Sequence, residues 1–600
     1  MQNARSLQRD DSRIIIHFDY DCFYASVVEN ENPALKSVPL AIQQKQIVVT
    51  CNYEARRRGL RKLQLITEAK RVCPDAVIVL GEDLTRFRDA SKELYGFLQR
   101  SVWSGRAERL GFDEVWLDCT DMVDYNVGLL NQNDLTHSFF CLARDDPTVG
   151  FDYDASTVFG PTFPAHAFQR ASCTEEEAQL RQRLVVGSHL ARHLRHELES
   201  QKGYTSTVGI ATNKLLAKLV GNVNKPKSQT TILPPYRPVG HVDATVTQFL
   251  DKHDIGKIPG IGFKLAQKIR TCVLGRQLGL PQPYTCGDAK YSVTVQDVRS
   301  HSGMGPEMLE EILGGAGSPR GIGGKVWELI HGIDDSEVGK VKRVPSQISQ
   351  EDSYPRYLVT FAEVKKQLHT LSERLIRRMR MDLLEDEEGE GEEEFRPREA
   401  GPRRRWMAHP RTIRLSTRAR PATAPDGARQ RMSNRISRSA PMPNLVFSLV
   451  EEPSILADRL VEETLVPMFR KLHHEKAGWN LNLINVAVTN MAETAAESKD
   501  SQGRDIGRMF RRQDEVLKDF RVTVDSEGDD GTGSLSPRGE HLDPEIPDSI
   551  RNAPKADCLA TDDWDFEGDD GQQADRCEYC HYEVPSFALA AHRRYHELGT

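Results

Sequence analysis

The sequence predicts a multidomain α/β protein, and three features support that prediction. The chain has 600 residues, whereas a single hydrophobic core rarely grows beyond about 250–300 residues. Its first half alternates short β-branched runs with segments of helical periodicity, as expected for a sheet with crossover helices. A long polar stretch then separates this region from a small Cys/His cluster at residues 577–596. We therefore expect several domains joined by polar segments.

The composition narrows the class of protein. Charged residues make up 28% of the chain and hydrophobic residues 38%, which suits a globular protein with some disordered segments. The net charge of −8 does not exclude nucleic-acid binding, because much of the acid lies in residues 385–394 and 529–570. The eleven cysteines lack regular spacing, which favours a reducing compartment. No apolar run approaches the roughly 18 residues that span a bilayer, and residues 1–13 are polar, so an intracellular, soluble protein is expected.

In the first half, strands are expected at 13–19, 47–51, 110–119 and 206–210, and helices at 22–29, 52–59, 180–199 and 214–220. The first strand, RIIIHFD, is a β-branched run that ends in an acid. The third, LGFDEVWLDC, carries two acids in its middle. Residues 125–171 are less regular and are expected to form an insertion.

The second half is expected to contain three further parts. Residues 256–269 (GKIPGIGFKLAQKI) favour two helices joined by a glycine-rich hairpin, and residues 321–330 repeat the pattern weakly. A unit at 345–491 is expected to contain helices at 361–383 and 454–472 and strands at 412–417 and 481–489. Residues 492–575 are polar and poor in aromatic side chains, which favours disorder.

Three acids in the predicted strands are the candidate catalytic and metal-binding residues. Asp19 ends the first strand, and Asp113 with Glu114 lies inside the third. Neighbouring strands can bring such carboxylates together, and carboxylates are the hard oxygen ligands that Mg²⁺ prefers. A single acid at a strand end is more often a solvated surface group. Two adjacent acids inside an apolar strand are harder to explain that way, because burying an unpaired carboxylate is costly.

Several long motifs resemble the Y-family of DNA polymerases. They are DYDCFYASVVE at 19–29, CNYEARRRGL at 51–60, CPDAVIVLGEDLTRFRDAS at 73–91, ERLGFDEVWLDCTDMV at 108–123 and VGIATNKLLAKLV at 208–220 with the following NKPKSQTTILP. The resemblance runs in order from Arg13 to Met491. It implies low-fidelity translesion synthesis, in which two divalent cations assist nucleotidyl transfer from a deoxynucleoside triphosphate (dNTP) to a primer 3′-hydroxyl on primer–template DNA.

The resemblance also implies a right-hand polymerase with palm, fingers, thumb and little finger. The palm would comprise residues 13–23 and 86–236, with an insertion at about 125–171, and the fingers 24–85. The thumb, with a helix-hairpin-helix, would comprise 237–335, and the little finger 345–491, with insertions at about 385–405 and 418–440. A disordered tail at 492–574 and a ββα-like zinc finger at 575–598 would follow.

Individual site residues follow from the same resemblance. Asp19, Asp113 and Glu114 match the acids that hold two Mg²⁺ (or Mn²⁺) ions, with the backbone carbonyl of Tyr20 as a further ligand. Tyr24 matches the aromatic gate that excludes a 2′-hydroxyl, although such a ring is otherwise an ordinary core residue.

The incoming triphosphate is expected to meet Tyr53, Arg56 and Lys225. Tyr53 and Arg56 are three residues apart and would share one face of a helix. The guanidinium offers a planar fork to phosphate oxygens, whereas an ammonium acts as a point charge. A lone Arg or Lys is more often a solvated surface residue.

Residues 43–50 (QQKQIVVT) are expected to contact the template base through Gln44, Lys45 and Ile47. In one branch of the family this segment narrows the space over that base, which implies a template purine turned to syn and paired by its Hoogsteen edge. Accuracy opposite template A and poor fidelity opposite T would follow. Ile47 stands where a leucine is expected and Gln46 where an aromatic residue is expected.

DNA binding is expected at two places. Gly260 and Gly262 resemble a helix-hairpin-helix, in which glycine lets backbone amides approach a phosphate. Arg411, Arg414 and Arg418, with 403–405 nearby, would form a cationic surface on the third unit. Arginine clusters beside acidic runs also occur in disordered, self-paired loops.

The tail carries two candidate binding motifs. Cys577, Cys580, His592 and His596 have the spacing C-x2-C-x11-H-x3-H, which predicts a structural Zn²⁺ site. Its position resembles the ubiquitin-binding finger of another branch of the family, and DNA binding through the basic helix is the alternative. Residues 505–510 (DIGRMF) resemble a degenerate peptide for a sliding clamp.

Two other functions compete with the leading interpretation. One is a bypass polymerase of the branch that carries the zinc finger. The other is a non-catalytic scaffold recruited by ubiquitylated partners, which the intact acids argue against. Nuclear location and the absence of a membrane partner are expected from the family.

Overall fold

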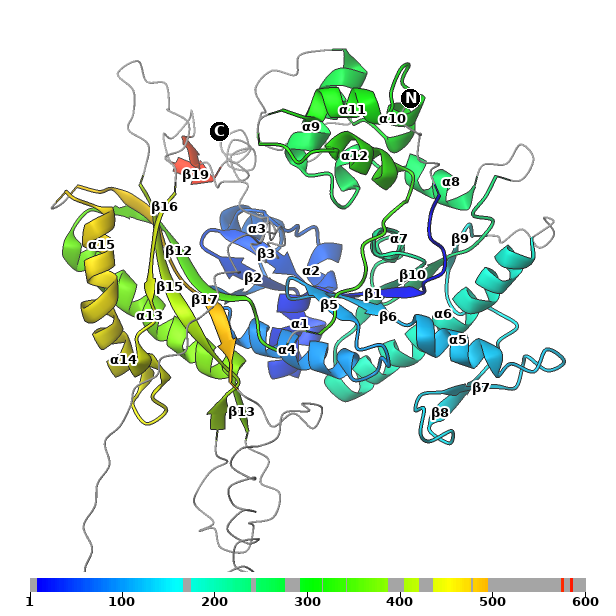
Figure 1. The fold of residues 1–600 in the computed structure, drawn as a ribbon, viewed down its shortest axis with the longest axis horizontal. Helices are drawn as coiled ribbons and strands as arrows, with labels where there is room; N and C mark the ends of the chain where they lie inside the picture. Colours follow the sequence, from blue (N-terminus) through cyan, green and yellow to red (C-terminus); the bar gives the residue numbers. More distant parts are fainter. Residues whose placement is uncertain are drawn as a thin grey trace, which may run out of the picture. The chain divides into compact units, whose positions relative to one another are not determined.

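The computed structural model describes residues 8–165, 174–238, 244–275, 292–315, 317–341, 343–386, 404–419, 435–475 and 478–494, together with two short strands within 574–585. The chain divides into two compact units (Figure 1): residues 1–341 with 563–600, and residues 342–562. Among the described helices, none combines the length and apolar character needed to cross a membrane.

A six-stranded mixed sheet forms the centre of the first unit, in the order β5-β6-β1-β10-β11-β9. Its strands are β1 (Ile15–Tyr20), β5 (Ala107–Leu110), β6 (Glu114–Asp118), β9 (Thr162–Phe163), β10 (Ser206–Ala211) and β11 (Gln229–Ile232). The central strand β1 pairs antiparallel with both β6 and β10. Four of its six residues are apolar and all six are buried or nearly so, as expected for a strand covered on both faces.

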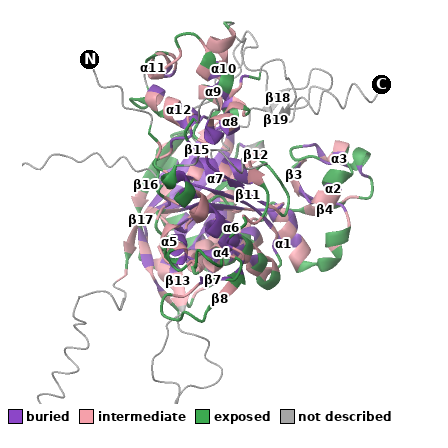
Figure 2. Ribbon diagram, turned by 90° about the vertical axis from the view of Figure 1, so that its right-hand side faces the viewer, coloured by how far each residue is buried: buried purple, intermediate pink, exposed green. Residues whose placement is uncertain are grey.

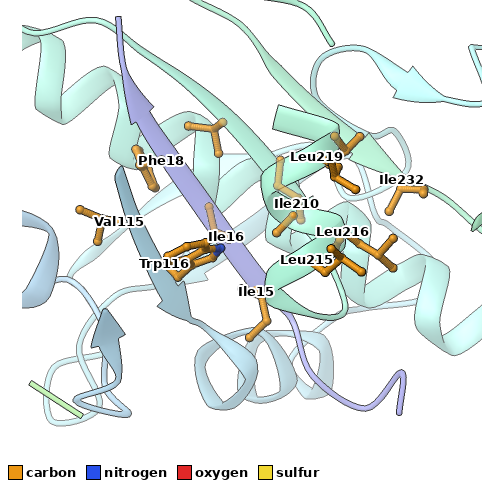
Figure 3. Close-up of a cluster of buried hydrophobic side chains, with 14 of the residues drawn as sticks. Ile15, Ile16, Phe18, Val115, Trp116, Ile210, Leu215, Leu216, Leu219 and Ile232 are labelled. Carbon is orange, nitrogen blue, oxygen red and sulfur yellow. The ribbon is translucent and has the colours of Figure 1, made fainter. Parts of the chain in front are cut away.

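Helices cover this sheet, and α7 (Lys214–Gly221) packs directly on β10. Figure 3 shows the side chains of Leu215, Leu216 and Leu219 beside Ile210 of β10. The approach depends on Gly209, because a Cβ there would lie 1.9 Å from the carbonyl oxygen of Ala217. Other helices of this unit are α1 (Phe23–Glu31), α4 (Thr85–Gln99), α5 (Thr120–Gly128) and α6 (Glu175–Lys202).

The helix predicted at 180–199 is confirmed and is longer at both ends, as α6. Thr174 caps its start by accepting a hydrogen bond from the amide of Glu177, and three glutamates fill its first turn. Gly203, with a φ of 76°, ends it in the left-handed conformation that favours glycine. The capping threonine and the terminating glycine are both present in the sequence. The prediction was shorter because it used apolar periodicity, which marks only the part of the helix that faces the sheet.

A second, three-stranded sheet lies within residues 33–80, in the order β3-β2-β4. Its strands are β2 (Leu40–Gln44), β3 (Ile47–Cys51) and β4 (Val77–Leu80). The same segment also contains the helices η1 (Pro33–Ser37), α2 (Tyr53–Arg57) and α3 (Ile66–Val72). Small buried side chains such as Ala41, Ala55 and Ala69 form its own core. The part of Figure 2 around α3 is accordingly more exposed than the six-stranded sheet.

Residues 125–165 are more regular than the predicted insertion. A hairpin of β7 (Ser138–Cys141) and β8 (Gly150–Tyr153) is followed by β9, which pairs parallel with β11 at the edge of the six-stranded sheet. The strands β7, β8 and β9 are only two to four residues long, too short for an alternating pattern to be recognised in the sequence.

The remainder of the first unit is helical. It contains α8 (Thr245–Asp251), η2 (Ile255–Lys257), α9 (Phe263–Leu274), α10 (Val295–Ser300), α11 (Pro306–Leu313) and α12 (Ile322–Ile330). The helix expected before the first glycine hairpin is only the one-turn 3₁₀ segment η2. The α12 helix is confirmed at the place of the weaker repeat.

The second unit packs helices on a four-stranded antiparallel sheet in the order β12-β17-β15-β16. Its elements are β12 (Gln347–Leu358), α13 (Phe361–Leu383), β13 (Leu384–Asp386), β14 (Arg404–Trp406), β15 (Ala408–Ala419), β16 (Ile436–Pro441), η5 (Asn444–Phe447), α14 (Pro453–Leu460), η6 (Val461–Leu465), α15 (Val466–Leu472) and β17 (Leu481–Glu493). Leu371 and Leu375 of α13 share one core with Ile413 and Leu415 of β15.

Two expectations for this unit are modified. The helix predicted at 454–472 contains a π-helical turn, η6, that ends two residues before Pro467, which cannot donate a backbone hydrogen bond. The insertion expected at 418–440 overlaps the sheet at both ends. Its first two residues belong to the end of β15, and its last five belong to β16, which pairs with β15. Its sequence, ISRSAP, lacks the apolar alternation that would have marked it as a strand.

In the tail, β18 (Ala574–Arg576) and β19 (Glu583–Pro585) pair antiparallel. The four candidate zinc ligands, Cys577, Cys580, His592 and His596, lie outside the described residues. So do residues 505–510 and Arg403.

Candidate active site

The strand order brings the three candidate acids together at one end of the central sheet. Asp19, near the end of β1, lies directly opposite Glu114, the first residue of β6. The backbone amide of Tyr20 donates to the carbonyl oxygen of Asp113 at 2.8 Å, so Asp113 lies beside the end of β1. Directly opposed residues of antiparallel strands have Cβ atoms roughly 5 Å apart. Acids separated by more than ninety positions in the sequence therefore form one cluster.

Burial and mutual repulsion make this cluster electrostatically unfavourable. Burial, and then the charges of Asp19 and Glu114, raise the pKa of Asp113 to about 7. Burial also raises the pKa of Asp19, although Lys225 opposes the shift. Lys225 forms an ion pair with Asp19, and the Nζ of Lys218 lies 2.7 Å from Oε2 of Glu114. Two lysines thus offset the charge of three acids.

The cluster is not arranged as a ready-made metal site. Among the described residues, no group of three or more His, Cys, Asp or Glu side chains has the geometry to hold a metal ion. Two of the three carboxylates are instead engaged by ammonium groups, Asp19 by Lys225 and Glu114 by Lys218. The donor chemistry nevertheless fits a divalent cation, since three carboxylates and the Tyr20 carbonyl are hard oxygen ligands.

Two neighbours of the acids were not predicted from the sequence. His17 is buried, and Nε2 of its ring lies 3.8 Å from Oε1 of Glu114. Burial, and then the charge of Lys218, lowers the pKa of His17 well below its usual value, which favours the neutral ring. Lys218 follows Lys214 by one helical turn on α7, and that spacing was the available signal for a cationic face toward β6.

Tyr24, at the start of α1, lies beside the acids between two other aromatic rings. Its ring stacks on Phe87 of α4 with centroids 4.2 Å apart and an interplanar angle of 21°. Phe112, directly before Asp113, has its ring centroid 6.1 Å away. Burial, and then the charge of Asp113, raises the pKa of Tyr24. The ring is therefore fixed in orientation next to the carboxylate cluster.

Tyr53 and Arg56 contact each other on α2, as their spacing predicts. The guanidinium carbon of Arg56 lies 4.5 Å from the centroid of the Tyr53 ring, and Nε of Arg56 donates to the carbonyl oxygen of Cys51 at 3.2 Å. Asn52 caps this short helix by accepting from the amide of Ala55. Burial is the main cause that raises the pKa of Tyr53, with the charges of Asp21 and Asp19 among the smaller causes.

The predicted template-base residues form the tip of the β2–β3 hairpin. Lys45 occupies the turn with a φ of 51°, and its amide donates to Glu82 at 3.1 Å. The side-chain amide of Gln44 donates to the carbonyl oxygen of Gly81 at 2.8 Å. Ile47 forms a bridge with Leu65. Residues 81–82 therefore hold the hairpin tip in place, which the sequence did not predict.

The two glycine hairpins of the helical segment differ in the state of their amides. Gly260 has a φ of 87°, and Gly262 precedes α9, where a Cβ would meet nothing within 4 Å. At the second hairpin, the amides of Gly321 and Gly323 donate to Glu310, at 3.1 and 2.6 Å. A protein carboxylate thus occupies the start of α12, while the start of α9 has no side-chain cap. Of these two hairpins, the second has its glycine amides occupied by a carboxylate, which makes it the less suited to a phosphate.

The three arginines of β15 do not share one face. Side chains alternate along a strand, and Ile413 and Leu415 point into the core of the second unit. Arg414 and Arg418 therefore lie on the opposite face of the sheet, whereas Arg411 has the parity of the core residues but is exposed. Nη2 of Arg414 donates to Gln347 of β12 at 3.0 Å.

Comparison with protein families identifies the class to which this fold and site belong. A model of the impB/mucB/samB family matches residues 18–222, and a model of the C-terminal domain of that family matches residues 345–503. Together they match more than half of the chain and include all three acids. The chain belongs to this family, the Y-family of DNA polymerases, which confirms the resemblance seen in its motifs.

Individual relatives narrow the branch. The chain is 31% identical over 480 residues to DNA polymerase iota of Homo sapiens, an alignment that covers 80% of this chain and 52% of the relative. It is 31% identical over 492 residues to DNA polymerase iota of Mus musculus, covering 82% and 56% respectively. DNA polymerase eta of Arabidopsis thaliana is 28% identical over 399 residues, covering 63% and 51%. The chain thus spans about half the length of these relatives.

Proposed function

We propose that this protein is a DNA-directed DNA polymerase that performs low-fidelity translesion synthesis. It would add deoxynucleotides from dNTPs to a primer 3′-hydroxyl on primer–template DNA. The observation that carries this proposal is the meeting of Asp19, Asp113 and Glu114 at the end of β1 and β6. A scaffold has no use for a partly buried cluster of carboxylates that lowers the stability of the protein, and the named relatives are polymerases.

The three acids and the Tyr20 carbonyl would hold two Mg²⁺ or Mn²⁺ ions. When bound, these cations supply activation of the 3′-hydroxyl and neutralise charge on the phosphates. Burial, and then the charges of Asp19 and Glu114, raise the pKa of Asp113, and bound cations would offset the negative charge of these three acids. Lys218 keeps Glu114 in place at the end of β6 through their ion pair.

The surrounding residues would bind and select the nucleotide. Lys225, Tyr53 and Arg56 supply the ammonium, hydroxyl and guanidinium groups suited to a triphosphate. Tyr24, held by Phe87, would close the space under the sugar ring, where a 2′-hydroxyl would clash. Selection of deoxynucleotides would then depend on the fixed ring plane.

The elements suit the arrangement of a right-handed polymerase. The six-stranded sheet would be the palm (13–23 and 86–236) and the three-stranded sheet the fingers (24–85). The helical segment would be the thumb (237–335), with Gly260 and Gly262 near a DNA phosphate, and the second unit the little finger (345–491). Of the little-finger arginines, Arg414 and Arg418 are better placed than Arg411 for a shared DNA surface, because they lie on one face.

We further propose iota-like base selection, in which a template purine turns to syn and pairs by its Hoogsteen edge. Gln44, Lys45 and Ile47 at the braced β2–β3 tip are the residues proposed to narrow the space over the template base. Two relatives named DNA polymerase iota align with about four fifths of the chain. An eta-like bypass polymerase is the second candidate, favoured by the cysteine–histidine spacing of the tail and a relative of that name.

Single-nucleotide insertion opposite each of the four template bases tests both levels. The full chain is expected to extend a primer with Mg²⁺ or Mn²⁺, and an Asp113→Ala variant is not. Iota-like selection predicts accurate insertion opposite A and error-prone insertion opposite T. Equal fidelity at the two templates would support the eta-like alternative. No extension under any condition would refute the polymerase function.

For the tail we propose a zinc finger at 575–598, with Zn²⁺ held by Cys577, Cys580, His592 and His596. The antiparallel pairing of β18 and β19 around the connection that contains both cysteines supports it. The finger would bind ubiquitin, including a ubiquitylated sliding clamp, and residues 505–510 would contact the clamp directly. These partners, and the DNA substrate, imply a nuclear location. Zinc content after mutation of Cys577 and Cys580 to Ser tests the ligand set.

A further inference from the structure

Asp21 is the second acid of the first motif, two residues beyond Asp19, and it differs from the acids of the cluster. Its side chain is only 4% exposed. One carboxylate oxygen accepts a hydrogen bond from the hydroxyl of Thr207 at 2.8 Å. The other accepts from the backbone amide of Lys227 at 2.9 Å. Both oxygens are therefore already engaged by the protein, which separates Asp21 from the residues suited to a metal ion.

The backbone of Asp21 is held just as firmly. Its amide donates to the carbonyl oxygen of Thr205 at 3.0 Å, and its own carbonyl oxygen accepts from the hydroxyl of Ser26 at 2.6 Å. Asp21 thus ties the end of β1 to α1 and to the start of β10. A carboxylate anchored in this way is a fixed reference point for whatever it binds.

What it binds is the loop Lys225–Lys227, between α7 and β11. Lys227 has a φ of 47°, a conformation that costs energy for a residue with a side chain and persists only when its surroundings enforce it. Pro226 has no amide hydrogen. The loop therefore contacts Asp21 through the backbone amide of Lys227, which donates a hydrogen bond to the carboxylate. The side chain of Lys227 forms a separate ion pair with Glu199 of α6.

The same loop carries Lys225, whose ammonium group pairs with Asp19. Asp19 and Asp21 therefore hold the loop at two points, one through a side chain and one through the backbone. Fixing the backbone at Lys227 limits where the Nζ of Lys225 can lie, because only Pro226 separates them. The position of that cation depends on an acid that it does not touch.

We propose that Asp21 is a positioning residue, which sets the place of the Lys225 ammonium for the incoming triphosphate by holding the amide of Lys227. The role rests on the proposed polymerase function, since the triphosphate is that reaction's substrate. Asp21 does not act as a metal ligand. Its loss affects nucleotide binding through Lys225 and leaves the metal requirement unchanged.

The test is single-nucleotide insertion by the full chain with Asp21→Asn, alone and combined with Lys225→Ala. Asparagine keeps one oxygen acceptor and loses the other, so the KM for dNTP is expected to rise roughly tenfold, with a smaller change in kcat. In the Lys225→Ala background the same substitution is expected to have little further effect, because the cation it positions is absent. The Mg²⁺ concentration for half-maximal rate is expected to stay within twofold.

Hydrogen exchange supplies a readout that does not depend on activity. Asp21→Ala, which removes both carboxylate oxygens, is expected to speed exchange at the amide of Lys227, measured on a peptide that spans 223–229. Thr207→Val, which removes only the other hydrogen bond to Asp21, is expected to shift KM in the same direction by a smaller factor. Glu199→Gln is the matched control, because it removes the side-chain partner of Lys227 and leaves the backbone bond intact.

The outcomes are distinct. Effects of Asp21→Asn and Lys225→Ala that multiply, or a raised Mg²⁺ requirement, would overturn the positioning role. Unchanged exchange at Lys227 in Asp21→Ala would overturn the contact itself. A wild-type chain that inserts no nucleotide would instead refute the polymerase function. Hydrogen exchange would still test the hydrogen bond between Asp21 and the amide of Lys227, because it does not depend on activity.

Discussion

The sheets of the two units place their charges in opposite ways. At the end of β1 and β6, three acids are crowded together and largely buried, and the pKa of Asp113 rises to about 7. On β15 of the second unit, Arg414 and Arg418 are spaced along the strand and remain partly exposed. Crowded, buried charge costs folding free energy and suits chemistry at one point. Dispersed charge costs little folding free energy. It suits a long anionic ligand that is bound through its phosphates without recognition of its base sequence.

The comparison predicts its largest effect at the crowded site. Asp19→Ala is expected to lower kcat for primer extension by about a thousandfold or more, since it removes a proposed ligand for the cations that would activate the reaction. The dissociation constant for primer–template DNA is expected to change less than threefold. Pre-steady-state extension and fluorescence anisotropy measure the two quantities. Equal losses in both would mean that Asp19 serves binding, and the contrast between the sheets would fail.

Next in size is the effect at Tyr24, which borders the acids. Tyr24→Ala opens the space beside Phe87 and is expected to reduce discrimination against ribonucleotides by about a hundredfold, through lost steric exclusion. Competing insertion of a ribonucleotide and the matching dNTP measures it. Tyr24→Phe keeps the ring and is the control, with discrimination close to wild type. Ribonucleotide exclusion that survives Tyr24→Ala would place the gate elsewhere.

A third prediction concerns the stability cost of crowding. The folded protein holds a proton on Asp113 up to about pH 7, whereas the unfolded chain releases it near pH 4. The folded state thus binds more protons between these values, and stability contributed by the protonated form is lost as pH rises through 7. Asp113→Asn is therefore expected to stabilise the metal-free protein at pH 8, by on the order of 3 kcal/mol, and much less at pH 4.

Urea unfolding at the two pH values measures this difference. Asp152→Asn on β8 is the matched control, because Asp152 is an exposed acid, and its substitution is expected to change stability by less than about 0.5 kcal/mol at either pH. A wild-type protein more stable than Asp113→Asn at pH 8 would show that the cluster is not strained.

The smallest effect is expected on the dispersed side. Arg414→Ala is expected to weaken DNA binding by about 1 kcal/mol for every sequence and to reduce the salt dependence by about one phosphate contact. Arg411→Ala is expected to do less, because Arg411 has the other parity on the same strand. Arg377→Ala on α13 is a control, since this exposed arginine lies on a helix and pairs with Glu373. Equal effects at 411 and 414 would contradict the assignment of faces.

Much of this arrangement was predictable from the sequence, for physical reasons. The strands that carry Asp19 and Glu114 are apolar runs interrupted by acids, and that interruption is visible without a structure. The contact between Tyr53 and Arg56 follows from helical spacing. Such features depend on neighbours along the chain, and local pattern is what a single sequence records best.

Features that depend on partners from distant segments were not predictable in this way. Nothing local to Lys218 specifies Glu114, and nothing local to Asp21 specifies the amide of Lys227. Likewise Glu310 looks like an ordinary helix-surface acid until it caps the glycines at 321–323. The short strands β9 and β16 were missed because their pairing, and not their composition, makes them strands.

Gly209 lies in the core, yet its lack of a side chain affects the charged residues around the carboxylate cluster. It lets α7 rest on β10 at backbone contact, and α7 carries Lys218 before the chain continues to Lys225. The height of that helix above the sheet therefore sets how far both ammonium groups extend toward the carboxylates. A methyl group at position 209 would push α7 away from β10. This apolar substitution would therefore change the distances between the two ammonium groups and the carboxylates that they pair with.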